Sequence, residues 1–130
     1  MPSNIDYIPG SDAIYNSFKA DVGKSYVSDV VTVLRNIKVL IYNGQDDYVV
    51  NTAGVLQYLN GMGWEYIGNW KRTRKVNWTI GGQVRGGAKV WGNLWFVLLN
   101  GAGHLVPADQ PDSAANMLGH FLKNNRDWQE

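Results

Sequence analysis

The chain has 130 residues, of which 45% are hydrophobic, and its formal net charge is +1. This composition predicts one globular domain over residues 1–130 and excludes an intrinsically disordered chain. The near-neutral charge, without a long basic face, argues against nucleic-acid and membrane-surface partners. The chain has no cysteine, which rules out disulfides and zinc–thiolate sites, and no apolar run reaches the roughly 20 residues of a membrane span.

The first third of the chain predicts two helices and one buried strand. Residues 1–10 are polar and contain two prolines, which indicates a loop. A serine and an aspartate can cap a short helix over residues 11–18, and apolar residues at helical spacing predict a second helix over residues 26–36. The apolar run at residues 37–42 is typical of a central parallel strand that is covered on both faces.

The rest of the chain predicts a helix, three strands and a closing helix. The first of these helices is capped at Asn51 and stops at Gly61. Residues 64–70 are aromatic and without a clear period, and the charge run at residues 71–75 indicates a solvated turn. Glycine turns join the expected strands Val76–Ile80, Gln83–Val90 and Leu94–Leu99, and the last helix covers residues 111–124.

Two loops that follow predicted strands carry residues suited to catalysis. Asp46 and Asp47 follow the strand at residues 37–42, and His104 lies in a glycine turn after the strand at residues 94–99. Enzymes with α/β sheets place reactive groups at the carboxyl ends of their strands. An acid loop followed by a histidine loop is the second half of a Ser–Asp–His chain order. We therefore expect a carboxylate and an imidazole to meet at one edge of the sheet.

Both loops resemble segments of the serine carboxypeptidases. Residues 39–51 (VLIYNGQDDYVVN) are similar to that family's acid segment, and residues 101–111 (GAGHLVPADQP) to its histidine segment. Residues 76–78 and 81–85 resemble the intervening strand pair, and the resemblance runs from about Ser11 to the end of the chain. It implies an α/β fold: the carboxyl-terminal part of an α/β-hydrolase core, with mixed sheet strands flanked by helices and incomplete on its own.

The resemblance also implies roles for the two loops. His104 would be the base that takes the proton of a serine nucleophile, and Asp47 would orient the imidazole and stabilise the imidazolium. Asp46 competes with Asp47, since either aspartate suits the turn chemistry of this loop. Gly101 and Gly103 allow the sharp turn that lifts the imidazole off the strand end.

The nucleophile of the family is missing from this chain. In the family it lies earlier, in an elbow resembling Gly-x-Ser-x-Gly. None of the six serines of this sequence has glycines two residues away on both sides: Ser3, Ser11, Ser17, Ser25, Ser28 and Ser113. We therefore expect the isolated chain to be inactive and to need an amino-terminal part or complementary chain that carries the serine. An uncovered apolar face would also allow homo-oligomers.

Several further residues have more limited interpretations. By resemblance, Leu105 would line the pocket of the leaving group, and Val50 replaces a cysteine of some relatives, so thiol reagents should not inhibit. Asn77 begins the glycosylation sequon Asn-Trp-Thr, although such a match within a strand also arises by chance. His120, in the last helix, is expected to be structural. No cluster has metal-ligand spacing and no glycine loop suits phosphates, so we expect neither a metal nor a cofactor.

The function implied by the resemblance is that of a serine-type carboxypeptidase. Such an enzyme releases carboxyl-terminal residues from peptides through an acyl-enzyme, in a lysosome or vacuole or outside the cell. Residues 1–6 do not have the pattern of a signal peptide. Two alternatives stay open: a non-catalytic binding or structural module derived from a truncated carboxypeptidase, and an acyltransferase of the same fold. A Gly-x-Ser-x-Gly elbow in a preceding coding sequence would favour an enzyme over the module.

Overall fold

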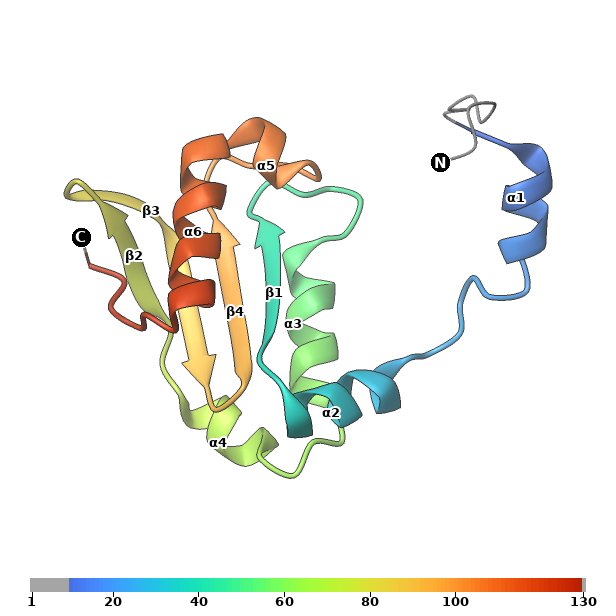
Figure 1. Ribbon diagram of the computed structural model, residues 1–130, viewed down its shortest axis with the longest axis horizontal. Coiled ribbons are helices and arrows are strands. Elements are labelled where there is room, and N and C mark those ends of the chain that lie inside the picture. The colour runs from blue at the N-terminus through green and yellow to red at the C-terminus, as the bar shows by residue number, and fades with distance from the viewer. Residues whose placement is uncertain (1–9, 130) are drawn as a thin grey trace.

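The computed structural model describes residues 10–129, and its centre is a four-stranded sheet in the order β1-β4-β3-β2 (Figure 1). The expectations for Ser3 and for the loop at residues 1–9 fall outside the described residues. β1 runs parallel to β4, whereas β3 is antiparallel to both β4 and β2, so the predicted mixed α/β sheet is confirmed. The strands are β1 (Val39–Gly44), β2 (Val76–Ile80), β3 (Gln83–Trp91) and β4 (Leu94–Leu99).

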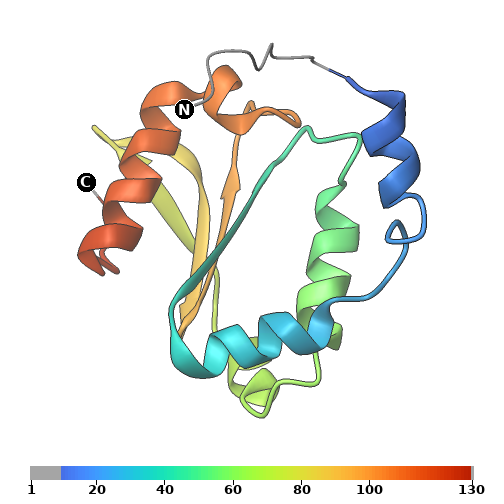
Figure 2. The same cartoon turned by 45° about the vertical axis from the view of Figure 1, so that its right-hand side comes forward.

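Helices cover both faces of this sheet. Three helices (α2, α3 and α4) lie against one face, and α6 covers the other, with the short α5 leading into it (Figure 2). The first helix, α1, stands apart from this body in both views. The helices are α1 (Asp12–Phe18), α2 (Val27–Asn36), α3 (Thr52–Gly61), α4 (Ile67–Arg72), α5 (Val106–Asp109) and α6 (Pro111–Lys123).

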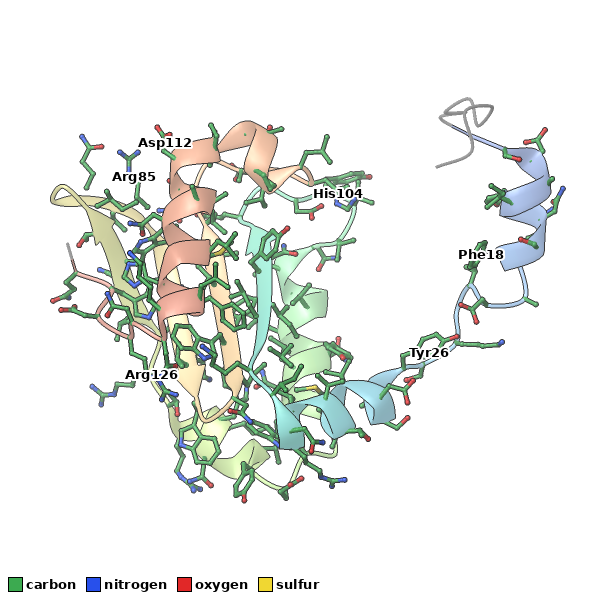
Figure 3. The ribbon with its side chains drawn as sticks, in the orientation of Figure 1. Phe18, Tyr26, Arg85, His104, Asp112 and Arg126 are labelled. Atoms are coloured by element: carbon green, nitrogen blue, oxygen red, sulfur yellow. The ribbon has the colours of Figure 1, made fainter. Side chains whose placement is uncertain are left out.

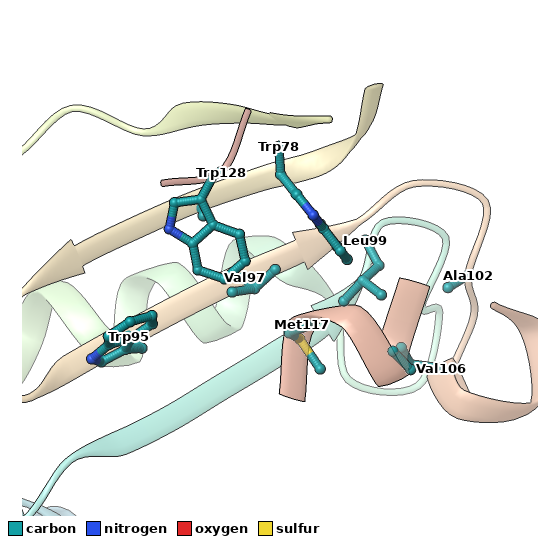
Figure 4. Packing of buried hydrophobic residues seen from close by; sticks show 10 residues of the cluster. Trp78, Trp95, Val97, Leu99, Ala102, Val106, Met117 and Trp128 are labelled. Carbon is teal, nitrogen blue, oxygen red and sulfur yellow. The ribbon is translucent and has the colours of Figure 1, made fainter. Parts of the chain in front are cut away.

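The strand β4 supplies the core on both faces. Successive side chains of a strand point to opposite faces, so Trp95, Val97 and Leu99 face α6 while Leu94 and Phe96 face α2, α3 and α4. All five are at most 1% exposed. Figure 4 shows the α6 side of this core, where the β4 side chains meet those of α6 and of the chain end. A continuous apolar strand is therefore required here, as the sequence predicted.

The predicted irregular segment and part of the predicted charged turn form a helix instead, α4. Trp70 is completely buried, and the Lys89 amine lies over its ring at 4.4 Å from the centroid. Packing of Trp70 stabilises a six-residue helix that sequence propensity alone would not hold. Lys71 and Arg72 end this helix and are exposed, so they are solvated, but on a helix rather than in a turn.

Other elements also differ from the prediction. The first strand begins at Val39 rather than Ile37, because the Ile37 N–H closes α2 by donating to Val33 O and its side chain is 61% exposed. The short helix α5 was not predicted, and Asp109 lies at its end. Short helices of this kind are decided by tertiary contacts.

The described residues leave apolar surface and the outer edge of β1 uncovered. β1 has a neighbour on one edge only, where a central strand was expected. On α1, which has no buried residue, Ile14 and Phe18 are 61% and 59% exposed. Within residues 10–129, no helix has both the length and the apolar character that crossing a membrane requires.

Candidate active site

The carboxyl ends of β1 and β4 place two loops side by side. The strands are parallel, and Gly44 is opposite Leu99 where both end. The residues that follow the two strands therefore emerge at the same edge of the sheet, and His104 lies there, above the end of β1 (Figure 3). Open α/β sheets bind their ligands at this edge.

The backbones of the two loops are in direct contact. The N–H of Gln45 donates to Leu99 O at 2.8 Å, and the N–H of Asp46 donates to Ala102 O at 2.9 Å. A Cβ atom at Gly44 would lie 2.2 Å from the carbonyl oxygens of both Ala102 and Gly103. Glycine is thus required at position 44 by the close approach of two backbones, a requirement that the sequence analysis did not identify.

Asp47 is held as a buried, ionised carboxylate. Its side chain is 5% exposed, and Oδ1 accepts hydrogen bonds from the N–H groups of Val50 at 2.8 Å and Val49 at 2.9 Å. The Val50 bond is the main reason that the pKa of Asp47 lies below its usual value; His104 and the Val49 bond add to this, while burial opposes it. The carboxylate is therefore charged at neutral pH.

His104 completes a pair with this carboxylate. Its Nδ1 lies 3.1 Å from Asp47 Oδ2, within the range expected for a base and its orienting acid. Because the carboxylate can only accept, we assign the proton to Nδ1, which leaves Nε2 as the nitrogen with a free lone pair. The His104 side chain is 52% exposed, so the ring is accessible from outside.

The choice between the two aspartates follows from this geometry. Asp47 makes the contact with His104, whereas Asp46 is exposed and contributes its backbone N–H to the histidine loop. Asn43, which the sequence analysis did not single out, is buried and lies beneath the acid loop. Its Nδ2 is 3.0 Å from Gly44 O and 3.1 Å from Val50 O, so it fixes both ends of that loop.

The remaining predicted residues lie in different places. Leu105, next to His104, is 67% exposed, and Val50 lies beside the site at 47% exposure. Asn77 is exposed on the edge strand β2. His120 is buried in α6 and stacks on Trp128 at 4.4 Å, the structural role expected of it. Among residues 10–129, no group of three His, Cys, Asp or Glu side chains could hold a metal ion.

None of the serines of the described residues belongs to the two loops. They occur before or within α1, before or within α2, and in α6. They are Ser11, Ser17, Ser25, Ser28 and Ser113.

Comparison with known proteins gives one consistent family. Residues 2–124 match the family described as serine carboxypeptidase. A serine carboxypeptidase S10 family member 2 from Dictyostelium discoideum is 40% identical over 97 residues, covering 71% of this chain and 17% of the relative. The venom serine carboxypeptidase of Apis mellifera is 33% identical over 121 residues, covering 93% of this chain and 26% of the relative.

A solved structure shares the fold. The crystal structure of Kex1(delta)p, a prohormone-processing carboxypeptidase from Saccharomyces cerevisiae, matches with a TM-score of 0.76 at 20% identity, over 88% of this chain and 26% of that one. The fold is therefore that of an α/β-hydrolase, as expected. The chain spans about a quarter or less of the length of these three proteins.

The contact between the loops predicts that Gly44→Ala is destabilising. The added methyl group would overlap two carbonyl oxygens, so we expect a loss of about 3 kcal/mol in the free energy of unfolding and separation of Asp47 from His104. Urea denaturation followed by tryptophan fluorescence measures the first effect. Gly61→Ala is the matched control, because a Cβ there meets nothing within 4 Å; equal losses in both variants would contradict the explanation.

The ionised state of Asp47 predicts a pH dependence of stability. A carboxyl whose pKa is lowered by folding stabilises the protein above its unfolded pKa, near pH 4, and this contribution is lost as the pH falls through the folded value. Asp47→Asn should therefore be less stable than the original chain at pH 7, and the difference should shrink below about pH 4. Unfolding measured at both pH values tests this, with the exposed Asp46→Asn as control. A difference independent of pH would show that the charge is not responsible.

Proposed function

The chain belongs to the serine carboxypeptidase family, and on that premise we propose that it supplies the base His104 and the orienting acid Asp47 of a serine-type carboxypeptidase. The observation that carries the proposal is the 3.1 Å contact between a buried carboxylate and a half-exposed imidazole. Such a pair suits general-base catalysis, because the acid fixes the tautomer of a ring that still has accessible surface.

In the proposed reaction, a serine of the amino-terminal part transfers its hydroxyl proton to Nε2 of His104 as its oxygen attacks the last peptide carbonyl. The C–N bond then breaks, and the imidazolium gives this proton to the nitrogen of the departing amino acid. Water next attacks the resulting ester, its proton passing through Nε2 back to the serine oxygen, which releases the shortened peptide. Asp47 stabilises the imidazolium in both steps. We further propose that Leu105, beside the base, keeps the leaving-group pocket apolar.

We also propose a partner for this chain: the amino-terminal part of a serine carboxypeptidase. The N–H of Val39 donates to Asn93 O, on the β4 side of β1. Because the N–H and C=O groups of successive residues in a strand point to opposite edges, those of Leu40 and Tyr42 face the open edge of β1. An apolar groove of about 340 Å³ lies beside that edge, under α5 and α6. It is lined by Leu40, Tyr42, Pro107, Pro111, Ala114, Ala115, Met117 and Leu118.

The secretory pathway is the proposed setting, either a lysosome-like or vacuolar compartment or the outside of the cell. The family supports this, and so does the relative from Apis mellifera, which is described as a venom protein. Asn77 is exposed on an edge strand and could accept a glycan there. Protein purified from its native source should lose mass on treatment with an N-glycosidase, and Asn77→Gln should abolish that loss. An unchanged mass in the native protein would argue against glycosylation.

The catalytic proposal predicts severe losses of activity in a complemented enzyme. Residues 1–130 are co-expressed with the amino-terminal part of a serine carboxypeptidase and assayed with a blocked dipeptide. We expect His104→Ala and Asp47→Asn to lower kcat/KM by about 10⁴-fold, the larger loss being that of His104, because it moves the proton. Asp46→Asn, which alters the exposed neighbour, should be nearly normal.

The same assay distinguishes an enzyme from a non-catalytic module. The chain alone should show no turnover and no labelling by a fluorophosphonate, since it lacks a nucleophile in an elbow. A complex that forms but has no activity would favour the module. A folded, complemented His104→Ala variant with normal turnover would refute the role of the base.

The partner proposal predicts that groove substitutions weaken the complex. A charged side chain in the groove would be buried without a partner, so Leu118→Arg should raise the dissociation constant by about 10-fold or more. Leu122→Arg is the matched control: it lies on the same helix, is 69% exposed and does not line the groove. Analytical ultracentrifugation measures both affinities. A monomeric chain that binds no amino-terminal part would overturn the proposal.

A further inference from the structure

The turn that carries His104 is closed by two consecutive side chains from the end of α5. Asp109 Oδ2 accepts a hydrogen bond from the Gly103 N–H at 2.7 Å, and Gln110 Nε2 donates to Gly101 O at 3.1 Å. The Gly103 N–H belongs to the peptide between Ala102 and Gly103, so the Asp109 contact fixes the backbone one residue before His104. The bond is short, as expected when the acceptor is charged.

Asp109 is itself anchored by the element that carries it. The N–H groups of Ala108 and Asp109 donate to Leu105 O at 2.8 and 3.0 Å, and Val106 is 2% exposed in the core beneath α6. The segment from Gly103 to Asp109 therefore forms a loop that the bond between the Asp109 carboxylate and the Gly103 N–H closes. Val106 anchors this loop in the core, and the loop carries His104.

Packing in the core does not require an aspartate at position 109, because this residue is exposed. Ala102, by contrast, is completely buried and receives the Asp46 N–H, so the middle of the turn is held from the acid loop. Gly101 has φ 64°, a conformation in which the turn needs glycine. The peptide between Ala102 and Gly103 is thus held at its carbonyl by the acid loop and at its N–H by Asp109.

We propose that Asp109 is a positioning residue for His104. Through its hydrogen bond to the Gly103 N–H, Asp109 keeps the imidazole in contact with Asp47. The inference rests on the proposed function, in which His104 acts as the base. The Asp109 carboxylate acts as a hydrogen-bond acceptor, and its negative charge strengthens the bond. The carboxylate does not contact the reacting atoms. Loss of the acceptor would free the Ala102–Gly103 peptide, one residue before His104, and let the ring turn away from Asp47.

The test uses the full 130-residue chain, which has two histidines, His104 and His120. Nitrogen NMR of the labelled protein reports the tautomer of each ring and the exchange of its N–H with water. In Asp109→Ala, we expect His104 to shift toward the Nε2–H tautomer and its Nδ1–H to exchange about tenfold faster, as when one charge-assisted hydrogen bond is lost. The buried His120 should be unchanged, which shows that the fold is intact.

Two substitutions separate positioning from a general effect. Asp109→Asn keeps an oxygen acceptor at the same place and should restore most of the original His104 signal. Asp112→Ala removes an exposed aspartate from the first turn of α6 and should leave His104 unchanged. An unchanged His104 in a folded Asp109→Ala chain would overturn the proposal, as would an effect of equal size in Asp112→Ala.

Two measurements cover the other outcomes. If Asp109→Ala does not fold, hydrogen exchange of the Gly103 N–H is measured in the original chain. This N–H should exchange at least about tenfold more slowly than a free amide, and exchange at the free rate would overturn the proposal.

Asp47→Asn separates this inference from the proposed function. If that change alters the His104 ring while Asp109→Ala does not, only the positioning role fails. If Asp47→Asn leaves the ring unchanged, both fail.

Discussion

The parallel pairing of β1 with β4 is the constraint on which the rest of this structure depends. It brings both strand ends level, at Gly44 and Leu99, and so sends the two loops out of the same edge of the sheet. The loops then approach so closely that only glycine fits at position 44. The Asp47–His104 contact is a consequence of this backbone arrangement, because side chains of this length can meet only when their backbones are already fixed.

The same pairing explains why β4 is the most buried strand. It has β1 on one edge and β3 on the other, with helices over both faces, so every position along it needs an apolar side chain. β1 shares one edge and leaves the other uncovered in the described residues. The site and the open edge therefore belong to one strand. Whatever pairs with β1 also lies beside the acid loop.

The two side chains of the site differ in burial and in the number of hydrogen bonds that hold them. Asp47 is nearly closed off and receives two backbone N–H groups besides His104, while His104 is half exposed. The carboxylate is thus more firmly fixed than the imidazole. This order suits the proposed roles, in which the carboxylate stays ionised and the imidazole reaches a reacting atom. These contacts come from the two loops that follow β1 and β4, which the parallel pairing of the strands brings together.

The sequence by itself determined the elements with strong local patterns. The apolar runs of β1 and β4, the glycine turns of β2 and β3, and the amphipathic helices α2 and α6 all follow from period and turn chemistry. The order of an acid loop before a histidine loop, each after a strand, was likewise enough to expect a carboxylate beside His104, and the family resemblance favoured Asp47 over Asp46. These features could be predicted because each depends on neighbours in the chain or on one motif.

Only the tertiary structure decided the features that depend on distant neighbours. The helix α4 exists because Trp70 is buried, and α5 because Val106 enters the core, and neither cause can be seen in a local window. Glycine is required at position 44 by the carbonyl oxygens of residues nearly sixty positions away. Asp109 had no role assigned from the sequence, yet it holds the turn before His104. In each case the deciding contact joins segments whose proximity the fold alone creates.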